Sequence, residues 1–78
     1  MPNQTQTPIE EFKLEGAEYI ELKSLLKVTN MVESGGAAKA AITDGLVTVN
    51  GAVETRKANK IKAGMVVMFE GQAIKVIG

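Results

Sequence analysis

One stretch in the N-terminal half has the hydrophobic spacing of a short helix. Within residues 20–28, Leu22, Leu25 and Leu26 occupy positions i, i+3 and i+4, so they would line one face of an α-helix. Asn30 is a suitable stop, because asparagine tolerates the left-handed conformation found at many helix ends. The pattern predicts a helix over residues 20–28 with a buried leucine stripe.

A second stretch repeats this spacing with smaller side chains. Ala38, Ala41 and Ile42 again stand at positions i, i+3 and i+4. Ser34 is a residue type that caps helix N-termini and Gly45 is typical of a helix C-terminus, so a second helix is predicted between them. Two short helices joined by a few residues predict an antiparallel helical pair.

The hydrophobic period changes to two in the C-terminal half, which predicts β-strands. Asn50 and Gly51 supply the two positive-φ positions of a type I′ turn, the strongest short-range signal of a β-hairpin. A similar alternation occurs near the N-terminus, where Phe12 and Leu14 fall on the same side. The predicted strands cover residues 11–14, 46–49, 52–55, 65–69 and 73–77.

These elements predict an α+β fold in which a helix–turn–helix-like αα pair packs on a small antiparallel β-sheet. The chain of 78 residues, 45% of them hydrophobic, is long enough for one modest core. Residues 1–8 are rich in Gln, Thr and Pro and are expected to form a disordered tail. Residues 9–78 are therefore predicted to form a single domain.

The residue types that are missing narrow the classes of function. The chain has neither cysteine nor histidine, so it offers no disulfide and none of the usual zinc ligands. It also has no apolar run long enough to cross a membrane and no signal-peptide pattern at its start. A cytoplasmic protein with no metal, cofactor or membrane partner is expected.

Catalysis is not expected from the remaining polar residues. Glu15, Glu18 and Glu21 are spaced by three and could share a face, yet the sequence predicts no apolar pocket that would raise the pKa of any of them. Ser34 has no histidine to act as a base and lacks the Gly-x-Ser-x-Gly pattern of a nucleophile elbow. The chain is therefore predicted not to be an enzyme.

Opposite charges are concentrated in the two halves of the chain, although the formal net charge is zero. Residues 1–33 contain six acids and three bases, which sum to −3, whereas residues 34–78 contain three acids and six bases, which sum to +3. A polyanion responds to the local electrostatic field, so the C-terminal half could still present a basic face to nucleic acid.

A glycine pair at the start of the second predicted helix is suited to binding phosphate. Gly35 and Gly36 follow Ser34 directly, and glycine within a helix costs about 1 kcal/mol relative to alanine. Bare N–H groups at a helix N-terminus can approach a phosphate closely, and Lys39 follows just over one turn later. Alternatively, the glycines only ease a tight turn or let another element pack closely.

Residues 56–62 form a basic connection that contains no acid. Its four cations are Arg56, Lys57, Lys60 and Lys62. Arginine can hold a phosphate through two parallel hydrogen bonds, whereas lysine acts as a mobile point charge. The alternative is a solvated loop that only keeps the protein soluble.

Aromatic side chains are scarce, which bears on how RNA would be recognised. Phe12 and Phe69 fall on inward strand positions, so Tyr19 is the one candidate for an exposed ring. Binders of single strands stack successive bases on exposed aromatic rings. Contacts to the phosphates and shape of folded RNA are therefore expected, rather than stacking on splayed bases.

The run over residues 34–67 resembles the RNA-binding domain named after ribosomal small-subunit protein four. The matching residues are Ser34, Ala38-Lys39, the spacing Ile42-x-x-Gly45-x-Val47-x-Val49-Asn50-Gly51, and Lys62 with Gly64 before Val66. Together with the leucines of the first helix, the resemblance covers about residues 20–77. Residues 33–36 and 51–57 are also similar to those of small stand-alone bacterial YbcJ-like proteins.

The resemblance implies an alpha-L motif that binds structured RNA, such as ribosomal RNA, along the second helix and the adjacent basic loop. Many relatives have Arg where this chain has Gly35, which removes a phosphate contact, and an acid where this chain has Met65. Residues expected to bind RNA are Ser34, Gly35, Gly36, Lys39, Arg56, Lys57, Lys60 and Lys62, with Lys23 and Lys27 added from the first helix.

The expected protein is a monomer that binds RNA, and two other functions stay open as alternatives. A protein–protein adaptor would need an exposed apolar patch, for which the candidates are Val28, Met31, Val53 and Met68. A ubiquitin-like sulfur carrier would need a free Gly-Gly tail, whereas this sequence ends in a single glycine directly after a predicted strand.

Overall fold

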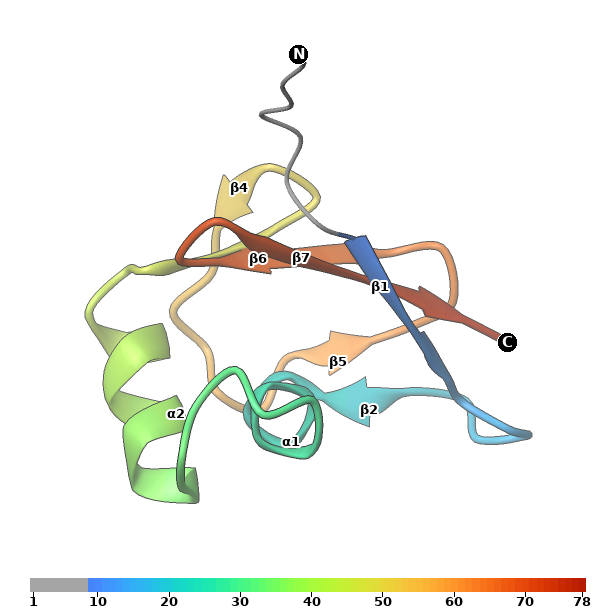
Figure 1. Ribbon diagram of the computed structural model, residues 1–78, viewed down its shortest axis with the longest axis horizontal. Helices are drawn as coiled ribbons and strands as arrows, with labels where there is room; N and C mark the ends of the chain where they lie inside the picture. The colour runs from blue at the N-terminus through green and yellow to red at the C-terminus, as the bar shows by residue number, and fades with distance from the viewer. Residues whose placement is uncertain (1–8) are drawn as a thin grey trace, which may run out of the picture.

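The computed structural model describes residues 9–78, which form a five-stranded sheet lying over two helices and a small two-stranded sheet (Figure 1). The elements in chain order are β1 (Ile9–Lys13), β2 (Ile20–Glu21), α1 (Leu22–Val28), α2 (Gly35–Thr43), β3 (Val47–Val49), β4 (Ala52–Val53), β5 (Lys60–Ile61), β6 (Val66–Phe69) and β7 (Gln72–Ile77). The α+β class is confirmed. The expected tail, residues 1–8, lies outside the described residues.

The larger sheet is mixed, not wholly antiparallel as predicted. Its strand order is β1-β7-β6-β3-β4, and the three pairs among β7, β6, β3 and β4 are antiparallel. β1 instead pairs parallel with β7, which sets Phe12 opposite Val76 and lets the half-buried ring pack against the core. The alternation of residues near the N-terminus predicts a strand and its inward face. It contains no information about which strand pairs with it or whether that pairing is parallel or antiparallel.

β2 and β5 form a two-stranded sheet that the hydrophobic pattern did not predict. Ile20 lies opposite Ile61, and Glu21 lies opposite Lys60. Ile61 is fully buried, so it anchors the basic connection to the core. As a result, the first helix begins at Leu22 and not at residue 20, and the predicted basic loop contains a strand.

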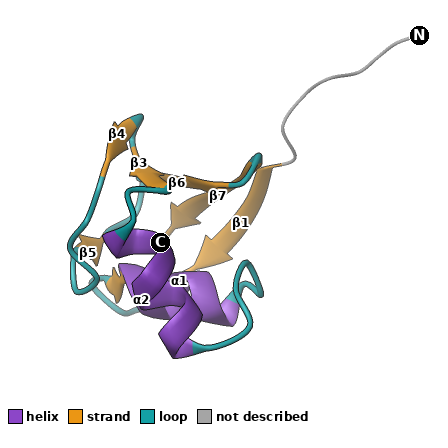
Figure 2. Cartoon of the chain, turned by 90° about the vertical axis from the view of Figure 1, so that its left-hand side faces the viewer, coloured by secondary structure: helices purple, strands orange, loops and turns teal. Residues whose placement is uncertain are grey.

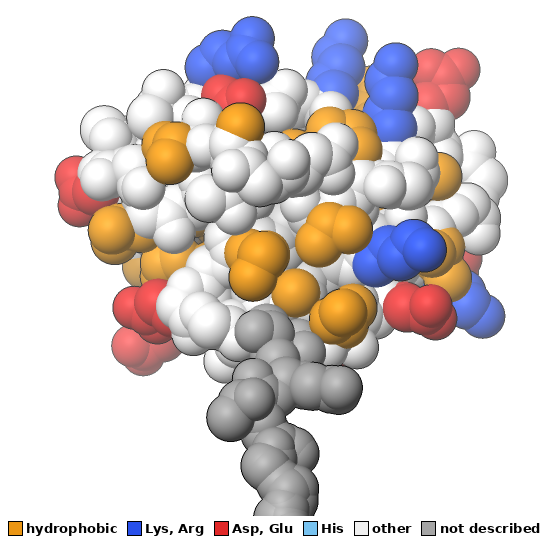
Figure 3. All heavy atoms as spheres, turned by 90° about the horizontal axis from the view of Figure 1, so that it is seen from above, with side chains coloured by type: hydrophobic (Ala, Val, Ile, Leu, Met, Phe, Trp, Pro, Cys, Tyr) orange, Lys and Arg blue, Asp and Glu red, His pale blue; other side chains and the backbone are white. Residues whose placement is uncertain are grey.

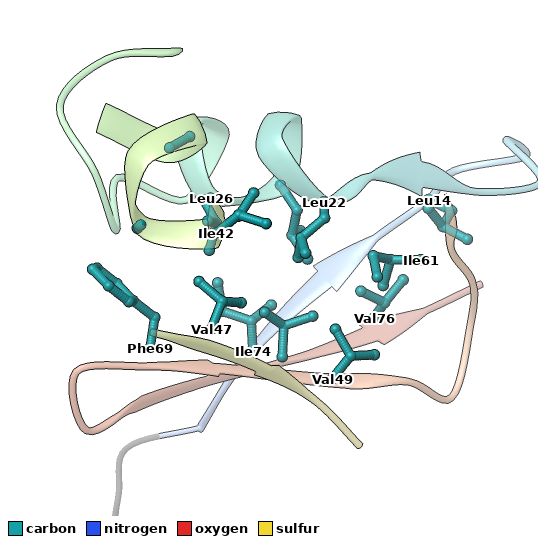
Figure 4. Close-up of a cluster of buried hydrophobic side chains, with 14 residues drawn as sticks. Leu14, Leu22, Leu26, Ile42, Val47, Val49, Ile61, Phe69, Ile74 and Val76 are labelled. Carbon is teal, nitrogen blue, oxygen red and sulfur yellow. The ribbon is translucent and has the colours of Figure 1, made fainter. Parts of the chain in front are cut away.

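Both predicted apolar stripes are buried between the helices and the sheet (Figure 4). They consist of Leu22, Leu25 and Leu26 on α1 and of Ala38, Ala41 and Ile42 on α2. The helices cross steeply and do not lie antiparallel: Figure 1 shows α1 almost end-on, whereas α2 lies along the vertical of the page. Neither of these two helices is long and apolar enough to cross a membrane.

The turns follow the sequence closely. Asn50 and Gly51 have φ of 52° and 86°, as a type I′ turn requires, and Asn30 has a φ of 61° after α1. Asn50 has an additional role that the sequence did not reveal. Its Oδ1 accepts a hydrogen bond from the Val66 N–H at 2.9 Å and its own N–H donates to the Val66 carbonyl at 2.8 Å, which ties the hairpin to β6.

Candidate nucleic-acid interface

The first turn of α2 has the cap and the open backbone that the sequence predicts. The Ser34 Oγ accepts a hydrogen bond from the Ala37 N–H at 3.1 Å, and the Ser34 carbonyl accepts one from the Ala38 N–H at 3.0 Å. The first N–H groups of a helix have no intrahelical partner, so those of Gly35 and Gly36 are available to an acceptor outside the helix. A Cβ at Gly35 would meet no atom within 4 Å, and one at Gly36 would lie 3.9 Å from the Ser34 Oγ. Close packing therefore does not explain the two glycines.

The basic connection is fastened to the start of α1 through the backbone. The Leu22 N–H donates to the Asn59 carbonyl at 2.9 Å, and the Lys23 N–H donates to the Lys57 carbonyl at 3.1 Å. The N-cap residue Glu21 makes no side-chain capping bond, so carbonyls of the connection satisfy donors that the first turn of α1 would otherwise leave open. Capping of α1 thus fixes where the cations of the connection lie.

The backbone brings three lysines from two distant stretches into neighbouring positions here. Lys57 and Lys23 are linked through the backbone hydrogen bond, and Lys60 lies opposite Glu21 in the β2–β5 ladder. The Lys23 Nζ is 3.9 Å from a Glu21 carboxylate oxygen, a partly exposed pair that offsets some of the local positive charge. We refer to Lys23, Lys57 and Lys60 as the lysine cluster.

Arg56 has a closer acidic partner than Lys23 has, so its charge is more fully compensated. Its Nε lies 2.9 Å from the Glu54 Oε2 and its Nη2 lies 3.2 Å from the Glu54 Oε1, while the Arg56 N–H also donates to Oε2 at 2.9 Å. The Asn59 Nδ2 donates to the same carboxylate at 3.1 Å. The side-chain and backbone hydrogen bonds from Arg56 lower the pKa of Glu54 from 4.5 to about 2, and the carboxylate raises the pKa of Arg56. In its ionised form, Glu54 therefore holds the start of the connection in place.

Sequence reasoning missed the part that Glu54 and Asn59 play in this loop. Glu54 stood within the family-like run at 51–57 but had no assigned role. The available signal was the spacing Glu54-x-Arg56, in which a carboxylate two residues before an arginine can accept both its N–H and its guanidinium. Arg56 still exposes 76% of its side chain, so its predicted contact with phosphate stays a prediction.

The other predicted cations are exposed but less closely connected to the cluster. Lys27 lies in the last turn of α1, Lys39 on α2 and Lys62 after β5, and all three are exposed. Across residues 9–78, no hydrogen bond or ion pair joins Lys39 to the basic connection. The predicted meeting of Lys39 and the connection at the start of α2 thus stays a prediction, whereas the contacts observed are at the start of α1.

Several basic side chains lie along one edge of the molecule. Figure 2 shows β5 and the connection that leads to it running down the left side, beside α2. The same side forms the upper rim of the view in Figure 3, where several Lys and Arg side chains stand out, with acidic side chains among and beside them. A rim of this kind can attract a polyanion even though the formal net charge is zero.

Comparison with known proteins identifies the domain. The sequence model of the S4 domain matches residues 12–77. The Escherichia coli (strain K12) protein named "Putative RNA-binding protein YbcJ" is 48% identical over 66 residues, which are 85% of this chain and 94% of that protein. The Bacillus subtilis (strain 168) protein named "Probable ribosome maturation protein RlbA" is 37% identical over 54 residues, which are 69% of this chain and 76% of that protein.

A solved structure shares the whole fold. The solution structure of YbcJ from E. coli has a TM-score of 0.71 and 41% sequence identity, and the alignment covers 100% of this chain and 96% of that one. That structure is described as revealing an αL motif involved in RNA binding. The resemblance inferred from the residues is thereby confirmed, as is the arrangement of two helices packed on a sheet.

Proposed function

This chain belongs to the S4 domain family, and from that premise we propose that it binds folded RNA through its lysine cluster and the first turn of α2. The observation that carries the proposal is the convergence of Lys23 with Lys57 and Lys60 at the start of α1. Cations brought together from distant stretches form a concentrated positive field, which is what a phosphate backbone recognises. The names of two similar proteins, which mention RNA binding and ribosome maturation, agree with this function.

In this proposal the contacts are electrostatic and sequence-independent, and no catalysis takes place. The lysine cluster neutralises phosphates, and the open N–H groups of Gly35 and Gly36 donate to a further phosphate at the positive end of the α2 dipole. Lys39, Lys27 and Lys62 extend the field over the same folded RNA. The Glu54–Arg56 pair holds the connection in the shape that presents Lys57.

Salt dependence of binding tests this proposal. Affinity for a labelled, folded fragment of ribosomal RNA is measured at rising salt for the wild type, for K23A/K57A/K60A, and for the control K13A/K75A on exposed positions of β1 and β7. Each phosphate contact contributes about 0.7–0.9 to the slope of log affinity against log salt, so the cluster variant is expected to lose roughly 2–3 in slope. Equal slopes for the cluster variant and the control would remove the lysine cluster from the interface.

A second candidate function, protein binding, is favoured by one feature of the sheet. Its outer face has a row of neighbouring residues from all five strands, and Figure 3 shows apolar side chains gathered there. The row is Ile9, Ala73, Met68, Thr48 and Val53, each in register with the next. Ile9, Val53 and Met68 are exposed by 65%, 61% and 37%, whereas Ala73 is buried, and exposed apolar side chains of this kind are typical of a partner surface.

The other residues considered for an adaptor divide between the surface and the core. Val28 is exposed at the end of α1, whereas Met31 is half-buried and packs against the core. Size-exclusion of cell lysate with and without nuclease separates the two functions. An adaptor would keep its high-mass position after nuclease treatment, whereas an RNA-binding protein would return to the position of the free chain.

A further inference from the structure

Tyr19 lies next to the lysine cluster and is the exposed aromatic residue among residues 9–78. Tyr19 is the residue directly before β2, and it is 38% exposed. By contrast, Phe69 is buried and Phe12 packs against the core. An exposed tyrosine beside Lys60 offers a flat apolar surface in a place where a polyanion is expected to lie.

The pairing of β2 with β5 determines the position of the ring. Tyr19 directly precedes β2 and stands two residues before Glu21, whose partner across the ladder is Lys60. The Lys60 Nζ accordingly lies over the Tyr19 ring, 5.0 Å from its centroid. This contact orients the ring and holds a cation over one of its faces, so a stacked base would take the opposite face, with Lys60 within the reach of the same nucleotide.

We propose that Tyr19 and Lys60 form a stacking site for one unpaired base of the bound RNA, with Lys60 contacting the phosphate of the same nucleotide. The inference rests on the proposed function and deepens it by naming the class of RNA. The ligand would be a folded RNA with a bulged or looped-out nucleotide beside a stem, because a base within a regular helix cannot stack on a side chain. The stem would lie against the other lysines.

This inference revises one expectation from the sequence. A single aromatic residue is too few for the rows of rings on which single-strand binders stack successive bases, so stacking was not expected. One ring is sufficient, however, for one displaced base in an otherwise helical RNA. The structure adds what the sequence lacked, namely that the ring is exposed and lies over a lysine of the cluster.

Two RNA hairpins test the inference. They are identical except that one has a single unpaired 2-aminopurine in its stem, and both are titrated with the wild type, Y19F and Y19L. Every base can stack on an aromatic ring, and stacking quenches the fluorescence of 2-aminopurine. The wild type and Y19F are therefore expected to bind the bulged hairpin roughly tenfold more tightly than the regular one and to quench its fluorescence. Y19L is expected to lose both the preference and the quenching.

The regular hairpin serves as the folding control. Y19L should still bind it, because the backbone contact between Lys23 and Lys57 does not involve the ring, and any affinity that Y19L loses on the regular hairpin is subtracted from its loss on the bulged one. If the wild type binds both hairpins equally and Y19L changes neither affinity nor fluorescence, the stacking site is wrong while RNA binding stands. If the wild type binds neither hairpin at any salt concentration, the proposed function fails, and this inference fails with it.

Discussion

Arg56 and Glu54 form a two-pronged ion pair across a single intervening residue, with nitrogen–oxygen distances of 2.9 and 3.2 Å. The carboxylate also accepts hydrogen bonds from the Arg56 N–H and from Asn59, so four donors converge on one acid. This arrangement fixes the loop between β4 and β5, and it leaves the pair electrically neutral in the middle of a basic segment. Both consequences can be measured.

Stability should depend on the ionisation of Glu54. Its pKa in the folded protein is about 2, below the ordinary 4.5, so the folded state favours the carboxylate. The resulting stabilisation is fully present above about 4.5 and is lost as the pH falls through about 2. The free energy of unfolding of the wild type should therefore exceed that of E54Q at neutral pH, and the difference should shrink over this acidic window.

Urea denaturation of both proteins at a series of pH values checks this prediction. The difference is expected to be small, because Arg56 is largely exposed and solvent screens such pairs. A difference that stays constant down to pH 2 would show that the carboxylate does not titrate with the depressed pKa.

Removing the Glu54–Arg56 pair as a unit should leave the electrostatics of RNA binding unchanged. E54Q/R56Q eliminates one positive and one negative charge and loosens the loop that presents Lys57, so affinity should fall at every salt concentration while the slope of log affinity against log salt matches the wild type. K57Q eliminates an uncompensated cation and should lower that slope by about 0.7–0.9. Filter binding at several salt concentrations distinguishes them, and an equal loss of slope in both variants would assign Arg56 a phosphate contact of its own.

Alanine at Gly35 or Gly36 should stabilise the protein and weaken RNA binding at the same time. Both positions have room for a Cβ, and alanine is favoured over glycine in a helix by about 1 kcal/mol, so the free energy of unfolding should rise. The added methyl groups should hinder a phosphate from approaching the backbone N–H groups. S34A is the matched control for the cap and should lower stability by about 1 kcal/mol.

Thermal melts and RNA titrations of the same samples give both readouts. An increase in stability with unchanged RNA affinity would favour the alternative that these glycines only ease the turn before α2.

Truncating Ile61 should destabilise the whole domain. This side chain is fully buried and anchors β5 opposite Ile20. I61A is expected to lower the free energy of unfolding by about 2–5 kcal/mol, and the milder I61V by about 0.5–1.5 kcal/mol. Chemical denaturation at neutral pH measures both, and a loss below 1 kcal/mol for I61A would mean that β5 contributes little to the core.

Local features of this protein follow from its sequence alone. The stripe of Leu22, Leu25 and Leu26, the cap at Ser34 and the turn at Asn50-Gly51 depend on residues within a few positions of one another. Their chemistry therefore specifies their conformation whatever the rest of the chain does. The cations of the candidate site could be named for the same reason, since charge is a property of each residue.

The partners of these elements were decided only by the tertiary structure. The parallel pairing of β1 with β7, the two-residue ladder of β2 and β5, and the hydrogen bond that joins Lys23 to Lys57 all connect residues far apart in sequence. No local pattern encodes such contacts, because they arise when the buried surfaces of all the elements are packed at once. For this reason the lysines can be identified from the sequence, whereas the packing of the core determines which of them lie next to one another.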